Sequence, residues 1–387
     1  MGKFDFDTIV ERRGNSIKWD VAENELPMWV ADMDFKTSPA ITQALQKRVE
    51  HGVYGYTDID DEWREAYINW YGRRYDFKIE KDWMIFSTGI VPAISSIVRK
   101  LTTPAEKVLL LTPVYNIFYN SILNNGRVPL ECKLTLKDNE YDIDFEKLEN
   151  GLSDPQTSLM ILCNPNNPGG NIWDRDTLAR IGSLCKKHGV IVLSDEAHCD
   201  LTLPGLKYNP FLDASDECRE VGIACLSPSK TFNVAGIHSA AVIVPDKFLR
   251  HKVWRGLNTD EVGEPNIFAV PMAVAAYNEG EEWLEELRIY LADNREYATD
   301  FINNEIPELK VIKGEATYLL WVNCRKIIND GQDIASLIRE TTGLYISRGE
   351  QYGLGGEGFI RINLACPRSV VEEGMRRLKL GIMNIFQ

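Results

Sequence analysis

Short runs of apolar residues, each bounded by turn-forming or charged residues, mark four strands in the middle of the chain. They cover residues 108–111, 159–163, 190–193 and 223–226. Such runs are typical of strands that are buried on both faces. Between the second and third runs, apolar residues recur at helical spacing at Leu178, Ile181, Leu184 and Cys185. This strand–helix–strand rhythm predicts a mostly parallel sheet with right-handed crossovers.

The helix between these runs has both a start signal and a stop signal. Asp174 is a residue type that caps helix N-termini, and Gly189 stands where helices often end. The sequence therefore predicts a helix over residues 174–188.

A long helix predicted near the C-terminal third separates this sheet from the rest of the chain. Apolar residues recur at helical spacing from Trp283 to Phe301, and Pro307 follows. We place the boundary between two domains within this helix. A large domain is expected over residues 46–285, and a small domain over residues 1–45 and 286–387.

The predicted small domain mixes strands with helices. Residues 317–322 and 358–363 are apolar runs of strand length. A C-terminal helix follows, with Ser369 and Glu372 spaced as a capping box. Its apolar positions, which we expect to face inward, are Val371, Met375, Leu378 and Ile382. This part of the chain therefore predicts an α+β unit.

Composition and charge exclude several classes of protein. Of the 387 residues, 44% are hydrophobic and 26% are charged, as in ordinary globular proteins. The formal net charge of −14 gives no positive field for nucleic acid or anionic lipid, so we expect neither partner. No apolar run is long enough to span a membrane, and residues 1–6 lack the apolar core of a signal peptide. The eight scattered cysteines show no metal-ligand spacing, and a reducing cytoplasm is the expected location.

One glycine motif carries no nucleotide-binding prediction. Residues 353–358 match the pattern G-x-G-x-x-G. In dinucleotide-binding proteins that pattern follows a strand and begins a helix, whereas here a strand-like segment comes after it. We interpret the motif as a flexible loop.

The candidate chemistry lies at the ends of the predicted strands. Residues 227–233 read Ser-Pro-Ser-Lys-Thr-Phe-Asn and place Lys230 just after one strand, where open α/β sheets bind ligands. Asp195 ends a second strand, and an Asn-Pro turn over residues 164–170 follows a third. Arg361 lies in a strand-like segment near the C-terminus. Each of these residues alone has an ordinary structural explanation, but three strand ends together bring a lysine, a carboxylate and a rigid turn to one sheet edge.

That combination matches what pyridoxal phosphate requires. A lysine amine forms the Schiff base, a carboxylate keeps the ring nitrogen protonated, and a donor near the ring oxygen positions the imine. The phosphate needs hydroxyls and backbone N–H groups at the start of a helix. Residues 87–91 (Ser-Thr-Gly-Ile-Val) supply such a turn immediately before a predicted helix over residues 92–101.

With these motifs in this order, the chain resembles the fold-type I pyridoxal-phosphate enzymes of the class I/II aminotransferase family over nearly its whole length. Residues 29–35, 195–198 and 229–233 are similar to the cystathionine β-lyase and cysteine desulfhydrase branch (MalY/PatB type). Residues 347–353, which lead into Arg361, are similar to bacterial C–S lyases of that branch. The resemblance implies a large domain with a mixed, mostly parallel, seven-stranded sheet and a small α+β domain.

The resemblance also implies roles for individual residues. Lys230 would form the Schiff base, and Asp195 would pair with the pyridine nitrogen. Arg361 would bind the substrate carboxylate, with Ala31 and Asn167 beside it. Tyr56 would act in catalysis by reaching the phosphate of the neighbouring subunit, in a homodimer with shared active sites.

The remaining implied contacts surround the cofactor. Asn167 would bond the ring oxygen, Tyr115 would stack on the ring, and His198 would lie near it. The phosphate would be held by Gly89, Ile90 and Ser227.

Two histidines distinguish this chain from many aminotransferases. His198 stands where many of them have tyrosine, and His238 where many have arginine. His198 agrees with the lyase branch. His238 removes a fixed positive charge from the phosphate site, which must then rely more on N–H groups and hydroxyls.

The resemblance favours a pyridoxal-phosphate-dependent C–S lyase. Such an enzyme converts cystathionine, cysteine or related S-substituted cysteines to thiol, pyruvate and ammonia by α,β-elimination. The residues themselves leave an aminotransferase open, because the two reactions share their early steps. A regulatory binding protein on the same scaffold is a third hypothesis, although the presence of Lys230 argues against a purely non-catalytic role.

Overall fold

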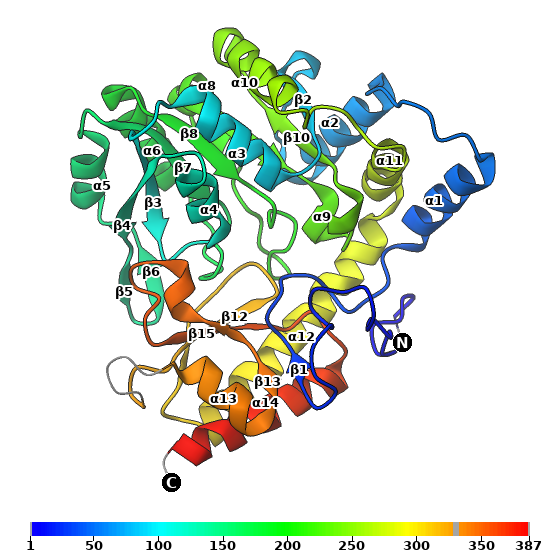
Figure 1. The fold of residues 1–387 in the computed structure, drawn as a ribbon, viewed down its shortest axis with the longest axis vertical. Coiled ribbons are helices and arrows are strands. Elements are labelled where there is room, and N and C mark those ends of the chain that lie inside the picture. The colour runs from blue at the N-terminus through cyan, green and yellow to red at the C-terminus, as the bar shows by residue number, and fades with distance from the viewer. Residues whose placement is uncertain (1, 328–332, 386–387) are drawn as a thin grey trace.

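Two sheets of different size organise the molecule, which is described by a computed structural model over residues 2–327 and 333–385 (Figure 1). The larger sheet has the strand order β2-β10-β9-β8-β7-β3-β4. Its strands are β2 (Met84–Ser87), β3 (Lys107–Thr112), β4 (Val128–Lys133), β7 (Thr157–Cys163), β8 (Ile191–Asp195), β9 (Gly222–Leu226) and β10 (Ala240–Ile243). Strand β10 pairs antiparallel with both β2 and β9, and the other pairs are parallel. The prediction of a mixed, mostly parallel sheet is confirmed.

The four predicted strands correspond to β3, β7, β8 and β9, and no predicted end differs by more than two residues. Their side chains alternate between two cores on opposite faces of the sheet. In β3, for example, Leu109 and Leu111 belong to one core, and Val108 and Leu110 belong to the other. Both faces are therefore buried, as the continuous apolar runs predict.

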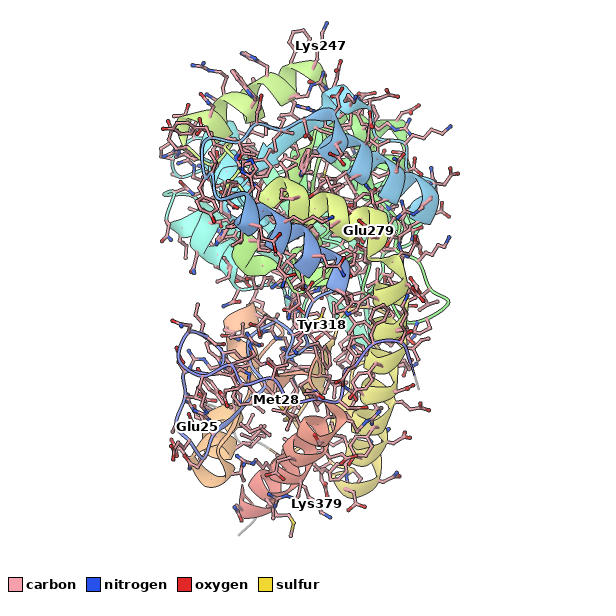
Figure 2. The ribbon with its side chains drawn as sticks, turned by 90° about the vertical axis from the view of Figure 1, so that its right-hand side faces the viewer. Glu25, Met28, Lys247, Glu279, Tyr318 and Lys379 are labelled. Carbon is pink, nitrogen blue, oxygen red and sulfur yellow. The ribbon has the colours of Figure 1, made fainter. Side chains whose placement is uncertain are left out.

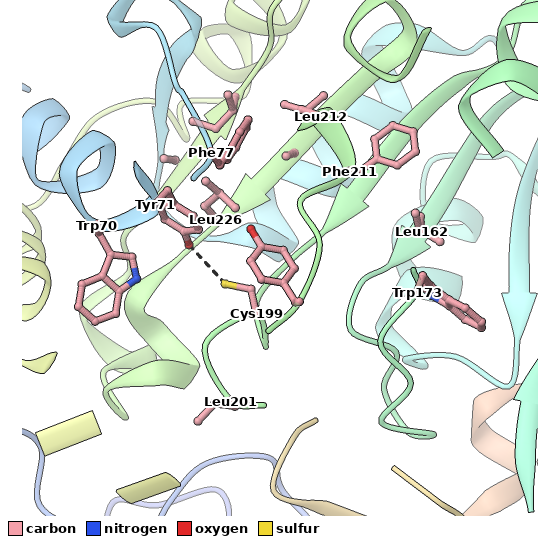
Figure 3. Packing of buried hydrophobic residues seen from close by; sticks show 14 of the residues in the cluster. Trp70, Tyr71, Phe77, Leu162, Trp173, Cys199, Leu201, Phe211, Leu212 and Leu226 are labelled. Carbon is pink, nitrogen blue, oxygen red and sulfur yellow. Dashed lines mark hydrogen bonds between the residues drawn. The ribbon is translucent and has the colours of Figure 1, made fainter. Parts of the chain in front are cut away.

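Helices cover both faces of this sheet. One face packs against α3 (Ile90–Leu101), α4 (Ile117–Leu123) and α10 (Lys247–Thr259). The other packs against α1 (Pro39–His51), α2 (Asp61–Tyr75), α5 (Phe145–Leu152), α6 (Arg175–His188), α7 (Phe211–Ala214), α8 (Asp216–Val221) and α11 (Ala269–Glu279). Figure 3 shows part of this second core, with Trp70 of α2 and Phe211 of α7 among its aromatic side chains.

Helix α12 (Glu281–Glu305) connects the large sheet to the rest of the chain. Its first half contributes Leu284 and Leu287 to the core of the large sheet, and its second half contributes Ala298 and Ile302 to a separate core. In Figure 2 the helix runs along one side of the molecule, downwards from Glu279. The residue at which one domain ends stays a prediction, and residues 1, 328–332 and 386–387 of the predicted small domain lie outside the described residues.

The separate core belongs to a four-stranded antiparallel sheet with the order β11-β12-β15-β14. Its strands are β11 (Lys310–Val311), β12 (Leu319–Asn323), β14 (Ser347–Arg348) and β15 (Phe359–Asn363). One face packs against α12, α13 (Ile334–Thr342) and α14 (Arg368–Ile385). The alternate positions Trp321 and Phe359 instead join the core of the large sheet. Arg361, two residues after Phe359 on the same strand, therefore faces the large sheet as well.

Two further pairs of short strands complete the fold. Strand β1 (Leu26–Pro27) pairs in parallel with β13 (Leu344–Tyr345), so the N-terminal segment joins the C-terminal unit. Strands β5 (Thr135–Lys137) and β6 (Glu140–Asp142) form an antiparallel pair.

Among the helices of the described ranges, none is long and apolar enough to cross a membrane.

Some local predictions are confirmed and others are wrong. The Asp174 side chain accepts a hydrogen bond from the Thr177 N–H at the start of α6, and Gly189 ends the helix at φ 71°, as predicted. The capping box at Ser369 is wrong, because α14 already begins at Arg368. The strand predicted from residue 317 begins only at Leu319, because Thr317 has a φ of 69°, which extended strands do not adopt.

Two further boundaries concern the candidate site. Helix α3 begins at Ile90, two residues before the predicted start, so the turn at Gly89 leads directly into the helix. The glycine motif over residues 353–358 forms turns between a short 3-10 helix (Gly349–Tyr352) and β15. No helix follows it, which agrees with its interpretation as a loop.

Replacing Asp174 with alanine should destabilise the protein, because the Thr177 N–H would lose its partner at 2.6 Å. We expect the free energy of unfolding to fall by about 1 kcal/mol. Urea unfolding followed by circular dichroism measures this change. Asp174→Asn keeps a capping oxygen and should stay close to wild type, and equal losses in the two variants would contradict the capping role.

Candidate active site

A cavity of about 210 Å³ lies where the carboxyl ends of β7, β8 and β9 meet. Asp195 is the last residue of β8, and Asn167 lies in the turn after β7. Lys230 belongs to α9 (Pro228–Thr231), which follows β9. The cavity is lined by nine of the predicted site residues: Ala31, Gly89, Ile90, Tyr115, Asn167, Asp195, His198, Ser227 and Lys230.

Lys230 reaches across the cavity to the N-terminal segment. Its Nζ donates a hydrogen bond to the carbonyl oxygen of Ala31 at 2.6 Å. Burial lowers the pKa of Lys230, Asp32 and Asp195 oppose that change, and the positive Arg361 adds to it. A lysine in this setting carries an amine that gives up its proton more easily than a surface lysine does.

Asp195 is a buried carboxylate with one hydrogen bond from the described residues. Its side chain is 6% exposed, and one oxygen accepts a hydrogen bond from the Ala197 N–H at 3.0 Å. Its neighbours on the adjacent strands are Cys163 and Cys225, which offer no charge. Burial raises the pKa of Asp195 to about 6, although the Ala197 N–H and Lys230 act in the other direction. Such a carboxylate is suited to pairing with a cationic N–H donor.

Arg361 joins this cavity to the small sheet. Its Nη1 donates to Asn167 Oδ1 at 3.0 Å, and its Nη2 donates to the carbonyl oxygen of Trp29 at 2.8 Å. The guanidinium does not itself line the cavity, but the buried Nε has no partner among the described residues. Because the Asn167 oxygen is held by Arg361, the amide nitrogen of Asn167 is the atom left to donate.

The start of α3 forms another wall of the cavity. Gly89 occupies the N-cap position and has no side chain that could cap the helix. The N–H groups of the first turn are therefore available to an anion. The Ser227 hydroxyl donates to the carbonyl oxygen of Ser239 at 2.7 Å, so its proton is already engaged within the protein.

Sequence reasoning missed two serines on this wall. Ser229 and Ser239 both line the cavity, and the buried Ser239 Oγ has no partner within the described ranges. Ser229 lies between Ser227 and Lys230 and could have been found from that motif. Ser239 has no local signal, because the pairing of β10 beside β9 brings it here. His238 also lines the cavity, at the position that many aminotransferases fill with arginine.

His198 is a neutral side chain in the cavity wall. Burial lowers its pKa to about 3, and the positive charges of Lys230 and Arg361 act in the same direction. The Nδ1 atom is buried and has no partner in the described part of the chain. The ring lies edge-on to Tyr318 at 5.9 Å between centroids. His198 therefore presents a polar atom that a ligand can satisfy.

Tyr56 stands apart from these residues. Its side chain is fully exposed, and it does not line the cavity of its own chain. It lies between α1 and α2 in a segment without regular secondary structure. The structure therefore does not bring Tyr56 to the site within one chain, and the shared site stays a prediction.

The N-terminal segment 29–33 contributes Ala31 to the cavity lining, as the resemblance implies, but sequence reasoning missed the contacts that hold this segment. Side chains from distant parts of the chain bind its carbonyl oxygens. Asn363 donates to the carbonyls of Val30 and Asp32, and Tyr318 donates to that of Ala31. These partners are almost 300 residues or more away along the chain, so no local pattern could reveal them.

The residues present fit pyridoxal phosphate. The open start of α3 and Ser239 suit a phosphate, Asn167 can donate to a ring oxygen, and Asp195 can accept from a pyridine N–H. Lys230 offers the amine within the same cavity. Within the described ranges no group of His, Cys, Asp and Glu side chains could hold a metal ion.

Comparison with known proteins gives consistent matches. Residues 23–378 match the family described as aminotransferase class I and II. The chain is 41% identical to cystathionine beta-lyase PatB of Bacillus subtilis, over 97% of this chain and 99% of that protein. It is 33% identical to protein MalY of Escherichia coli, over 99% of each chain. Among solved structures, cystalysin of Treponema denticola, which contains pyridoxal 5'-phosphate, is 32% identical with a TM-score of 0.94, covering 98% of this chain and 99% of that one.

The buried Asp195 carboxylate should lower the free energy of unfolding of the cofactor-free chain near neutral pH. Because burial raises its pKa to about 6, the folded state favours the protonated form, and the buried charge is unfavourable at higher pH. Asp195→Asn should therefore melt at a higher temperature than wild type at about pH 7, and the difference should shrink as the pH falls below about 6. Differential scanning calorimetry of both cofactor-free proteins across this range measures the effect.

The exposed carboxylate of Asp142 provides a matched control. Asp142→Asn should leave the melting temperature nearly unchanged at every pH. If Asp195→Asn behaved in the same way, the buried charge at Asp195 would not be unfavourable.

Proposed function

The chain belongs to the class I and II aminotransferase family, and on that basis we propose that it is a pyridoxal-phosphate-dependent C–S lyase. Its substrates would be cystathionine, cysteine or related S-substituted cysteines, and its products thiol, pyruvate and ammonia. The observation that carries the proposal is one cavity holding an amine of lowered pKa, Lys230, and a carboxylate of raised pKa, Asp195. Two similar proteins support it, because PatB is named a cystathionine beta-lyase and cystalysin contains pyridoxal 5'-phosphate.

Each residue of the cavity would have a distinct task. When bound, pyridoxal phosphate supplies an electron sink for the bonding pair left at the substrate α-carbon. Asp195 would accept a hydrogen bond from the ring N–H and keep that nitrogen protonated. Asn167 would donate from its amide nitrogen to the ring oxygen, because its own oxygen is held by Arg361.

The first turn of α3 would hold the phosphate. Its free N–H groups at Gly89 and Ile90, together with the Ser239 hydroxyl, provide donors that require no positive side chain. This arrangement is consistent with His238 in place of an arginine. The Tyr115 ring, which lines the same cavity, would pack on the cofactor.

Lys230 and Arg361 would act on the substrate. The planar guanidinium of Arg361 would bind the α-carboxylate through two N–H groups, which fixes the orientation of the Cα–H bond. Lys230 Nζ would remove the α-proton, and its lowered pKa makes the neutral, proton-accepting amine easier to form than in a surface lysine. Departure of a thiolate from the β-carbon and addition of one water complete the conversion to pyruvate and ammonia.

We also propose that the active form is a homodimer. Tyr56 lies outside the cavity of its own chain on an exposed segment, and Val53 and Tyr54 beside it are exposed as well. Apolar and aromatic side chains in a segment without secondary structure are suited to burial against a second copy of the chain. Tyr56 would then complete the phosphate site of the neighbouring subunit.

We also propose that the protein is located in the cytoplasm. All eight cysteines are buried and free. Such thiols are compatible with a reducing environment and need no oxidant for folding.

Incubation with L-cystathionine and no keto acid distinguishes a lyase from an aminotransferase. We expect pyruvate, detected with lactate dehydrogenase, and an equal amount of thiol, detected with a disulfide reagent. The Lys230→Ala variant should form neither product, because it lacks both the cofactor-binding amine and the base. If wild type formed pyruvate only when a keto acid was supplied, and converted that acid to an amino acid, the enzyme would be an aminotransferase.

Mixing two inactive variants tests the shared site. A hybrid of Tyr56→Phe and Lys230→Ala chains contains one site with both defects and one site with neither. The mixture should therefore recover up to about a quarter of wild-type activity, measured as pyruvate release. No recovery, with hybrid dimers demonstrated by mass spectrometry, would contradict a contribution of Tyr56 across the interface.

A further inference from the structure

A buried carboxylate outside the cavity has several donors around it. Asp200 lies in the turn after β8, five residues beyond Asp195, and is fully buried. Its Oδ1 accepts hydrogen bonds from Trp70 Nε1 at 3.0 Å and from the Tyr75 hydroxyl at 2.5 Å. Its Oδ2 accepts one from the Thr231 hydroxyl at 2.9 Å. Figure 3 shows Cys199, the residue that precedes Asp200, joined by a hydrogen bond to Tyr71 of α2.

These donors come from separate parts of the fold. Trp70 and Tyr75 belong to α2, and Arg74 of the same helix brings its Nε to 3.5 Å from Asp200 Oδ1. Thr231 belongs to α9. A buried charge with partners on both sides is costly to displace, because any movement leaves either the carboxylate or a donor unsatisfied. Asp200 therefore fixes α9 against α2 and against the turn that follows Asp195.

The hydrogen bond from Thr231 to Asp200 also affects the position of Lys230. The two residues are adjacent in α9, which has only four residues and little rigidity of its own. Ser227 fixes the start of this turn, because its hydroxyl oxygen accepts from the Ser229 N–H and its proton is donated to Ser239. At the other end, the Thr231 hydroxyl provides a side-chain anchor immediately after Lys230.

We propose that Asp200, acting through the Thr231 hydroxyl, is a positioning residue that holds Lys230 at a fixed place relative to Asp195. The inference rests on the proposed function, in which Lys230 binds the cofactor and moves the α-proton. Asp200 touches neither substrate nor cofactor. Its effect is to hold the backbone of Lys230 at a constant position relative to the segment that contains Asp195 and His198.

Loss of this anchor has a definite physical consequence. Lys230 Nζ donates to the carbonyl oxygen of Ala31 at 2.6 Å, and burial of the amine lowers its pKa. A looser α9 would let the amine sample wetter positions, so its pKa would rise toward that of an ordinary lysine. The amine would also spend less time where it can reach the α-carbon of a bound substrate.

Three variants separate positioning from general stability. Thr231→Val keeps the shape of the side chain but removes the donor to Asp200, and Thr231→Ser keeps the donor. Tyr75→Phe is the matched control, because it removes a different hydroxyl from the same carboxylate, on the α2 side. All three full-length proteins are compared with wild type by melting temperature.

The first readout needs no cofactor. Trace acetylation of the cofactor-free chain across a pH series, read by mass spectrometry of the peptide that holds Lys230, gives the apparent pKa of that amine. We expect a rise in Thr231→Val but not in Thr231→Ser or Tyr75→Phe. A rise of equal size in Thr231→Val and Tyr75→Phe would overturn the proposal, because it would reflect general loosening.

The second readout uses the cofactor-loaded enzyme. With L-cystathionine, kcat of Thr231→Val should fall by about tenfold while KM changes little, since the carboxylate site at Arg361 is intact. Thr231→Ser and Tyr75→Phe should stay within about twofold of wild type. Unchanged kcat and unchanged Lys230 pKa in a folded Thr231→Val protein would overturn the proposal. Absence of cofactor binding or of elimination in wild type would instead overturn the proposed function.

Discussion

Burial of charge between the two sheets is the constraint on which the rest of this structure depends. Arg361 extends from the small sheet and donates to Asn167 in the turn after β7 and to the carbonyl of Trp29. Lys230 extends from α9, which follows β9 of the large sheet, and donates to Ala31. Buried charges without such partners would be strongly unfavourable. The same contacts therefore hold the two parts of the chain together, with the Lys230 amine at the cavity and the Arg361 guanidinium against Asn167 in the cavity wall.

The N-terminal segment can serve this purpose because both ends of the chain build the small unit. Strand β1 pairs with β13, and Asn363 of β15 binds the carbonyls of Val30 and Asp32. Asn233, three residues after Lys230, binds the carbonyls of Met33 and Phe35. A segment without helix or strand hydrogen bonds is in this way made rigid by side chains. That rigidity gives Lys230 a fixed acceptor at Ala31.

Two adjacent buried carboxylates differ in how far the protein itself satisfies them. Burial raises the pKa of both Asp195, to about 6, and Glu196, to about 7. Glu196 accepts hydrogen bonds from Ser194, Tyr208 and the Phe211 N–H, so the protein itself satisfies it. Asp195 accepts one from Ala197 and faces the cavity. A carboxylate held partly unsatisfied beside a cavity costs stability, and it is the one that a cationic ligand would stabilise.

The sequence by itself determined the large sheet and the strand ends that form one side of the cavity. Continuous apolar runs specify buried strands, and the turn residues after β7, β8 and β9 necessarily meet because parallel strands end at the same edge. Asp174 and Gly189 likewise determined the ends of α6, because capping is local. Only the tertiary structure decided the contacts of Arg361, Ser239 and Asn363. Their partners lie on other elements or at the opposite end of the chain, and such contacts depend on how those elements pack, which no local pattern of residues specifies.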